Sequence, residues 1–121
     1  MDKADLQKRS MDFALRVLSL IRALPNESGT RRLKDQLFGS SSSTAANYRA
    51  ACRGRSKKEF IAKLGIVIEE CDETQFWLEF VIAGNFLPKE KVTPLLNEAN
   101  ELTAIFIASQ KTAICNLNTL K

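Results

Sequence analysis

The sequence predicts an all-α protein, an up-down-up-down antiparallel four-helix bundle in which residues 1–121 form a single domain. Two observations predict this fold class. Apolar residues recur at alternating three- and four-residue steps through four long segments, which is the spacing of one buried helix face. The chain also holds only five glycines and three prolines, too few for a loop-rich β protein, while 121 residues are enough to bury one core.

The first helical segment carries its apolar stripe from Leu6 to Leu24, where Pro25-Asn26 breaks the pattern. The stripe also includes Ser10, Phe13, Val17 and Leu20.

The second helical segment is expected over about residues 31–53. Its serine-rich run, residues 39–43, has the composition of a flexible linker. We expect this run to stay helical because the apolar stripe keeps its phase on both sides of it. Gly54 suits the position after the helix end, since glycine tolerates a left-handed backbone. The stripe is Leu33, Leu37, Thr44, Tyr48 and Ala51.

The third segment opens with Ser56 and Glu59, which have the spacing of a capping box, and ends at Gly84-Asn85. Its stripe is Phe60, Leu64, Val67, Cys71, Thr74, Leu78 and Val81. Either Pro88 or Pro94 is able to open the fourth helix in its first turn. The fourth stripe is Val92, Leu95, Ala99, Leu102, Phe106, Ser109 and Ala113.

Charge is distributed very unevenly along the chain. Residues 31–63 hold nine Lys and Arg against Asp35 and Glu59, a net charge of +7, whereas residues 64–84 hold five carboxylates and no cation. A basic block of this density favours a polyanionic partner, most economically nucleic acid. The acidic block indicates internal pairing or a basic partner.

Five cations with no carboxylate among them fall at the turn between the second and third helices: Arg49, Arg53, Arg55, Lys57 and Lys58. They form either a solvated charged end of the bundle or a phosphate-binding surface. The free N–H groups at the start of the third helix add to anion affinity. Tyr48 is the nearby aromatic residue and is expected inside, so binding would follow the backbone rather than stack on bases.

The acidic block is expected to lie along the serine-rich run, because residues equally distant from Gly54-Arg55 face each other in a hairpin. This places Glu73 opposite Gln36, Glu70 near Ser40, and Lys63 near Asn47. The predicted polar network that fixes helix register is Gln36, Ser40, Ser43, Asn47, Lys63, Glu70 and Glu73. The alternative, that Glu70 and Glu73 are paired catalytic carboxylates, requires a cleft that packed antiparallel helices leave little room for.

Residues 76–83 are apolar nearly all round the third helix. One stripe suffices for the core of a monomeric bundle, so some of these side chains must point away from it. Phe76, Trp77 and Phe80 are therefore the predicted oligomer interface.

Several classes of site are disfavoured by composition. There is no histidine, and Cys52, Cys71 and Cys115 are far apart, so we expect reduced thiols, no zinc or haem site and no cofactor. No apolar run is long enough to span a bilayer, and the N-terminus lacks the layout of a signal peptide. The chain is predicted to be cytoplasmic and not an enzyme.

Several motifs run through the chain. The central ones are Gln36-Leu37 with Ser43-Thr44-Ala45-Ala46-Asn47-Tyr48-Arg49, Arg53-x-x-Ser56-x-x-x-Phe60-x-x-Lys63-Leu64, and Glu69-Glu70-x-Asp72-Glu73-Thr74-x-x-Trp77-Leu78. The outer ones are Phe13-Ala14-Leu15-Arg16-Val17, Leu24-Pro25 and Asn97-Glu98-Ala99-x-Glu101-Leu102. Together they resemble a bacterial four-helix bundle family that includes proteins encoded in intervening sequences of 23S ribosomal RNA genes. It also includes accessory variability proteins of diversity-generating retroelements.

The resemblance implies a homo-pentamer, a basic surface suspected of contacting nucleic acid, and no established enzymatic activity. Two departures stand out: Ala50, where many relatives carry Glu, and Gly54, where Ala is more usual. The first removes a carboxylate and makes the basic face more positive.

Two functions are predicted from these features. The first is a non-catalytic oligomeric bundle that binds the backbone of RNA or DNA through its basic end. The alternative is a protein–protein adaptor that meets an acidic partner such as a polymerase or reverse transcriptase. Salt-dependent retention of nucleic acid on the purified protein separates the two.

Overall fold

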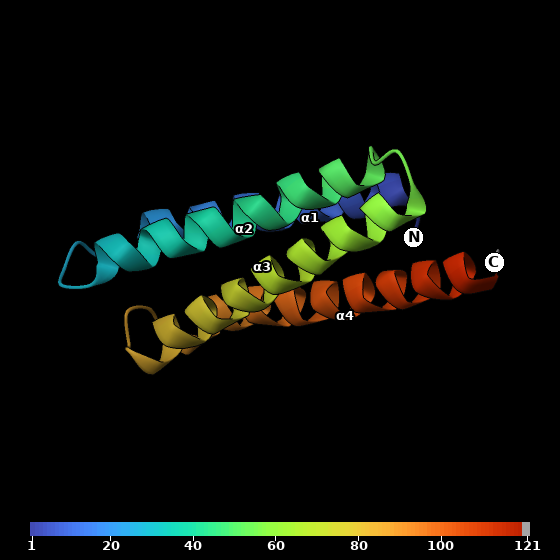
Figure 1. Ribbon diagram of the computed structural model, residues 1–121. Coiled ribbons are helices and arrows are strands. Elements are labelled where there is room, and N and C mark those ends of the chain that lie inside the picture. Colours follow the sequence, from blue (N-terminus) through green and yellow to red (C-terminus); the bar gives the residue numbers. More distant parts are fainter. Residues whose placement is uncertain (120–121) are drawn as a thin grey trace.

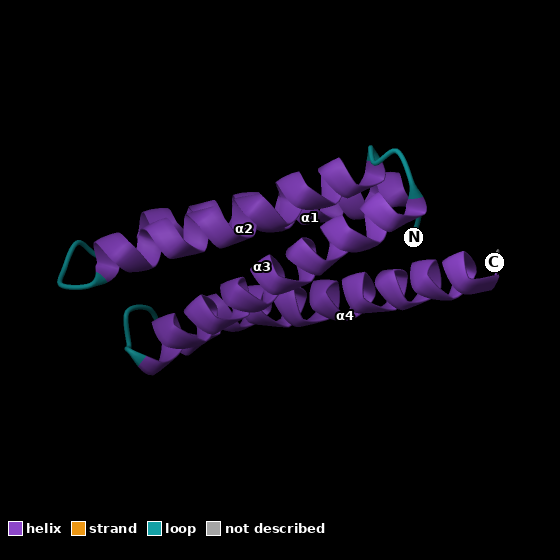
Figure 2. Ribbon diagram, in the orientation of Figure 1, coloured by secondary structure: helices purple, strands orange, loops and turns teal. Residues whose placement is uncertain are grey.

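The computed structural model describes residues 1–119, which form four helices without any strand: α1 (Lys3–Ala23), α2 (Thr30–Cys52), α3 (Lys57–Ala83) and α4 (Lys89–Thr119) (Figures 1 and 2). The predicted all-α four-helix bundle is confirmed. Leu120 and Lys121, the last residues of the predicted domain, lie outside the described residues.

The helices run alternately up and down, and each packs beside the next in sequence. The α2–α3 turn lies at the same end of the bundle as the start of α1, and the other two connections lie at the opposite end (Figure 1). Helix α3 crosses obliquely from the α1–α2 pair towards α4 (Figure 1). Contact between α1 and α4 is the least extensive of the helix pairs in contact.

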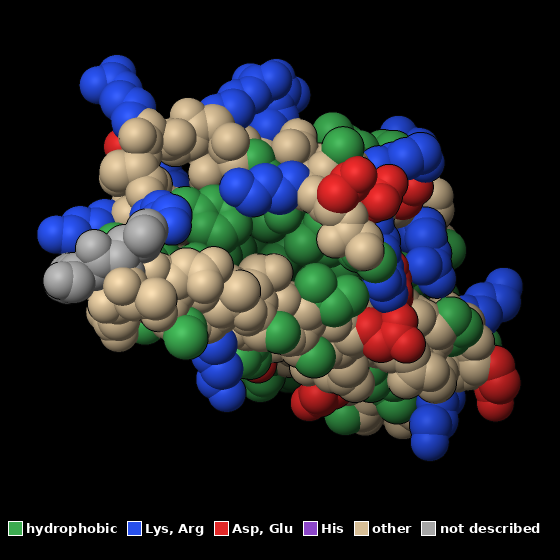
Figure 3. All heavy atoms as spheres, turned by 90° about the vertical axis from the view of Figure 1, so that its right-hand side faces the viewer, with side chains coloured by type: hydrophobic (Ala, Val, Ile, Leu, Met, Phe, Trp, Pro, Cys, Tyr) green, Lys and Arg blue, Asp and Glu red, His purple; other side chains and the backbone are tan. Residues whose placement is uncertain are grey.

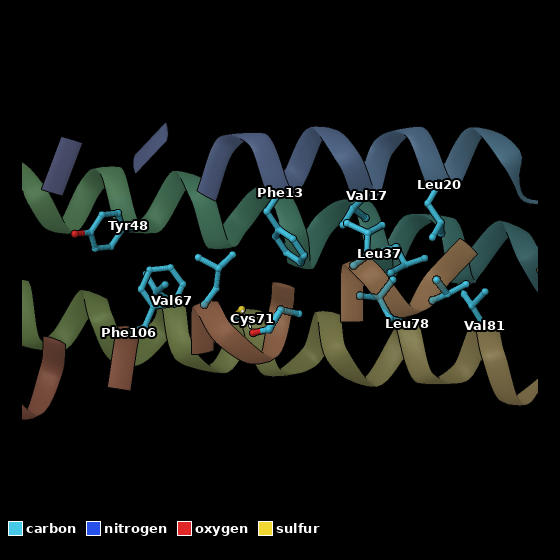
Figure 4. Packing of buried hydrophobic residues seen from close by; sticks show 14 of the residues in the cluster. Phe13, Val17, Leu20, Leu37, Tyr48, Val67, Cys71, Leu78, Val81 and Phe106 are labelled. Atoms are coloured by element: carbon cyan, nitrogen blue, oxygen red, sulfur yellow. Dashed lines mark hydrogen bonds between the residues drawn. The ribbon is translucent and has the colours of Figure 1, made fainter. Parts of the chain in front are cut away.

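One core runs between the helices and is filled by the predicted stripes. Nearly all stripe residues are buried; Phe60 is half-buried, and the α4 stripe is buried only as far as Phe106, beyond which Ser109 and Ala113 are partly exposed. Each fully buried Leu, Val or Phe stabilises the fold by roughly 1.5–3 kcal/mol. Figure 4 shows Phe13, Val17, Leu20, Leu37, Tyr48, Val67, Cys71, Leu78, Val81 and Phe106 meeting in this core.

The serine-rich run is helical, as predicted. Its hydroxyls donate to carbonyl oxygens one turn back: Ser41 Oγ to that of Leu37 at 2.7 Å, and Ser42 Oγ to that of Phe38 at 2.6 Å. Ser41 is buried, and this bond gives its hydroxyl a partner inside the helix.

The helix ends partly match expectation. Ser56 Oγ accepts from the Glu59 N–H at 3.1 Å, but the return bond of a full capping box is not formed. The full box is instead at the start of α1, between Asp2 and Asp5, and was not predicted. Helix α4 begins directly after Pro88, and Pro94 lies inside it.

Gly54 follows the end of α2 but is not left-handed, contrary to prediction. Its role is steric, because an added Cβ would lie 3.1 Å from the Ala51 carbonyl oxygen. The left-handed residues within 1–119 are Gly29 (φ 86°), which precedes α2, and Asn85 (φ 57°), which follows α3. At Asn85 a pair of bonds closes the helix, from the N–H of Asn85 to Ile82 and from that of Phe86 to Val81.

Candidate nucleic-acid interface

The five predicted cations gather at the end of the bundle that carries the α2–α3 turn. We call Arg49, Arg53, Arg55, Lys57 and Lys58 the basic end. All five are exposed, and within the described chain none has a carboxylate within 4.0 Å; the ion pairs there join Lys8 to Asp12 and Arg9 to Glu98 and Glu101. Figure 3 looks onto this end, where Lys and Arg side chains project on several sides of an apolar centre.

The basic end is divided between two depressions. Arg49 and Arg53 border a groove of about 680 Å³ that is walled mainly by α1 and α2. Arg55 and Lys57 border a second depression of about 450 Å³, together with Lys3. Lys58 lines neither of them. The cations therefore present a broad charged surface rather than one convergent pocket.

The start of α3 lies within the basic end. Ser56 accepts the N–H of Glu59, and the Phe60 N–H bonds to the Ser56 carbonyl, which leaves the N–H groups of Lys57 and Lys58 without intrahelical partners. The Glu59 carboxylate in this first turn opposes anion binding at the helix end. Anion affinity therefore depends on the side-chain cations more than on the helix dipole.

The predicted polar network contains one interhelical contact in the described residues, and it is displaced by one turn from expectation. Ser40 Oγ lies 2.9 Å from Thr74 Oγ1, which in turn lies 2.9 Å from the Glu70 carbonyl oxygen. Each hydroxyl carries one proton, so both contacts are satisfied when Thr74 donates to Glu70 and Ser40 donates to Thr74. Thr74 was predicted as a stripe residue and not as a member of the network.

Within residues 1–119, the other network residues either form hydrogen bonds inside their own helix or form no side-chain hydrogen bond. Asn47 Nδ2 donates to Ser43 Oγ and to its carbonyl, both at 2.9 Å. Glu73 accepts from the Trp77 indole at 3.3 Å, and Lys63 borders the groove. Pairing of Gln36 with Glu73, and of Lys63 with Asn47, stays a prediction. Burial and the nearby carboxylates of Glu73 and Glu69 raise the pKa of Glu70 above its usual value.

Arg9 of α1 forms an ion pair with α4 that the sequence patterns did not predict. Its Nε and Nη2 atoms lie 2.8 Å and 2.6 Å from the two carboxylate oxygens of Glu98, and Nη2 also lies 2.6 Å from Glu101. The Arg9 hydrogen bonds hold the pKa of Glu98 below its usual value, although partial burial opposes the shift. The sequence signal was weak: two carboxylates three residues apart on one helix.

The predicted interface residues behave differently from one another. Phe76 and Phe80 are 54% and 45% exposed, whereas Trp77 packs partly against the core. The Trp77 ring lies 4.9 Å from that of Phe76 and 5.6 Å from that of Phe80, measured between centroids. We call these three residues the aromatic patch. As expected, at least part of it points away from the core.

The described residues contain no group of three or more His, Cys, Asp or Glu side chains placed to hold a metal ion. None of the helices described is long and apolar enough to cross a bilayer. Cys71 is buried, and this burial raises the pKa of its thiol to about 11.

These features define an all-α four-helix bundle with one basic end and an exposed aromatic patch. Residues 2–108 match the sequence model of the 23S rRNA-intervening sequence protein, and the chain belongs to this family. The family resemblance drawn from the motifs is thereby confirmed.

A solved structure with the same fold comes from Bacteroides thetaiotaomicron VPI-5482 and is described as a protein with unknown function from the S23 ribosomal protein family. The two chains are 31% identical with a TM-score of 0.84, and the match covers 92% of this chain and 99% of the other. A comparison with curated proteins finds no match.

Proposed function

We propose that the protein is a non-enzymatic, oligomeric four-helix bundle that binds the backbone of RNA or DNA through its basic end. The observation that carries this proposal is the set of five exposed cations within ten residues, Arg49 to Lys58, without ion-pair partners in the described chain. Because two helix ends and a four-residue turn already fix their backbone, these cations displace counterions from a polyanion with little further ordering of the main chain.

The chemistry of the basic end favours phosphates over bases. Stacking on bases needs exposed aromatic faces beside the cations. Tyr48 is buried in the core, and the Phe60 ring is occupied by the Lys3 ammonium, 4.5 Å from its centroid. Binding is therefore expected to tolerate sequence changes and to weaken steeply with salt.

The oligomer in this proposal rests on the aromatic patch. Two adjacent phenylalanines, each about half exposed, leave apolar area that a neighbouring subunit would remove from water. Repetition of the basic end around an assembly would turn a weak phosphate site into a strong one. Within each subunit, the polar residues between α2 and α3 are proposed to fix register, and the contact between Ser40 and Thr74 supports this role.

The family description adds a direction to the proposal. It refers to intervening sequences of 23S rRNA, so RNA is the first nucleic acid to test. The proposed location of the protein is the cytoplasm. Catalysis is not part of the proposal. Glu73 bonds to the Trp77 indole and Glu70 lies one turn away on the same helix, an arrangement that suits a structural role.

A second candidate function is an adaptor for an acidic protein such as a polymerase or reverse transcriptase. The observation that favours it is the apolar groove beside Arg49 and Arg53, which suits a protein better than a nucleic acid. Titration of labelled RNA and DNA at several salt concentrations separates the candidates. If the logarithm of the binding constant falls linearly with the logarithm of salt concentration, the nucleic-acid-binding function is supported. If neither RNA nor DNA binds at low salt, the adaptor function is favoured.

A further inference from the structure

The groove between α1 and α2 is a candidate docking surface. Its lining combines small side chains, including Ser42, Ala45 and Ala46, with Leu15 and Phe38, which are each 53% exposed. One end is basic, where Arg49, Arg53 and Lys63 outnumber Glu59. The groove is therefore apolar along its length and positively charged at one end.

The aromatic patch on α3 has the opposite charge. Glu69, Asp72, Glu73 and Glu79 surround Phe76 and Phe80 on the helix, and residues 64–84 contain no Lys or Arg. The molecule thus carries two different exposed apolar surfaces, one with a basic end and one in an acidic surround.

Charge decides how these surfaces pair between copies. Two aromatic patches related by a two-fold axis would bring two acidic blocks together, whereas the groove offers the opposite charge at one end. Seating the aromatic patch of one copy on the groove of another would instead place the phenylalanine rings over small residues. The carboxylates around the patch would then lie beside Arg49, Arg53 and Lys63. We propose that Phe76 and Phe80 of one copy seat in the α1–α2 groove of a second copy, in a head-to-tail contact. This inference rests on the oligomer proposed above and adds which two surfaces meet.

The test uses two variants, each damaged on one surface. Phe76→Glu removes the apolar side chain from the patch and keeps the groove. Ala46→Glu puts bulk and negative charge into the groove and keeps the patch. Both positions are exposed and helical, and glutamate suits a helix, so both variants should fold. Ala104→Glu, on the exposed side of α4, is the matched control.

Sedimentation should find the parent and the Ala104→Glu control assembled, and each surface variant alone as a 13.5 kDa monomer. An equimolar mixture of the two variants should form a heterodimer of twice that mass, because one intact groove meets one intact patch. If the parent is assembled, the pairing is overturned when either surface variant stays assembled, or when the mixed variants stay monomeric, while the oligomer stands. A groove reserved for an acidic adaptor partner would leave Ala46→Glu assembled. A monomeric parent would instead sink the proposed oligomer itself.

Discussion

Arg9 and Glu98 join the first helix to the last through two parallel hydrogen bonds, with N–O distances of 2.8 Å and 2.6 Å. The pair lies where α1 and α4 have the least extensive contact of the packed helices. Both side chains are partly buried, at 26% and 15% exposed, so their bonds are screened less than those of a surface pair. The pair therefore closes the bundle where apolar packing is thinnest.

Replacing Arg9 by Ala should lower the free energy of unfolding by about 1–3 kcal/mol, because it leaves the Glu98 carboxylate partly buried without its partner. Arg9→Lys should recover only part of the loss, since an ammonium cannot make the bidentate contact. Chemical denaturation at pH 7 measures both. Equal stability of Arg9→Ala and the parent would show that the pair contributes nothing.

The same pair predicts a pH dependence. The folded-state pKa of Glu98 is lowered from 4.5, so its contribution is present above that pH and is lost as pH falls through the lower folded value. The stability difference between the parent and Glu98→Gln should therefore shrink as pH falls below about 4.5. A difference that stays constant from pH 7 to pH 3 would contradict the assignment.

Glu70 predicts the opposite sign. Its folded-state pKa is raised by burial and by Glu73 and Glu69, so stability is full below the unfolded pKa and is lost as pH rises through the folded one. Glu70→Gln should stabilise the protein at pH 7 by about 0.2–1 kcal/mol, the scale of a screened, partly exposed charge. Thermal melts at pH 7 and pH 4 check this, since the gain should be absent at the lower pH. Asp72→Asn, an exposed position on the same helix, is the control.

The contact between Ser40 and Thr74 should be visible as coupling. Thr74→Val keeps the shape but removes the hydroxyl, and Ser40→Ala removes its partner. Each change should cost about 1 kcal/mol, and the double variant should cost less than the sum by about 0.5 kcal/mol or more. Strict additivity in urea denaturation would mean that the two hydroxyls do not act together.

Local sequence patterns predicted most of the fold. The contacts that were not predicted depend on how one helix is placed against another. The α3 stripe from Leu64 to Val81 is a 3.6-residue periodicity, which any buried helix face must have. No local pattern indicates how far α1 is shifted along its axis relative to α4, so the ion pair of Arg9 was not predicted. A symmetric hairpin placed Glu70 beside Ser40, whereas the side chain that meets Ser40 is that of Thr74, one turn further along a helix that crosses α2 obliquely (Figure 1).

The candidate site also has features that the sequence predicts and features that depend on helix packing. The five cations of the basic end are neighbours in sequence around one turn, so their gathering at one end was predictable. Their division between two depressions was not, because it depends on which side chains of α1 and α4 border each one. Likewise the apolar run 76–83 predicted exposed aromatics, while the packing of neighbouring helices decides that Trp77, rather than Phe76, is partly buried.

Phosphate binding at the basic end is tested by comparing Arg55→Ala/Lys57→Ala/Lys58→Ala with the matched triple Arg31→Ala/Arg32→Ala/Lys89→Ala, which removes the same charge at the opposite end. Arg53 is kept because it borders the groove. The quantity measured is the affinity for RNA and DNA against salt concentration.

We expect the first triple to bind both nucleic acids more weakly than the parent, whatever their sequence. Its log–log salt slope should be flatter than that of the parent by about 0.7–0.9 per lost phosphate contact, while the second triple keeps most of the slope. Both should keep the parent's helical circular dichroism, since exposed charges contribute little to stability. Equal affinity of the first triple and the parent at every salt concentration would contradict the claim.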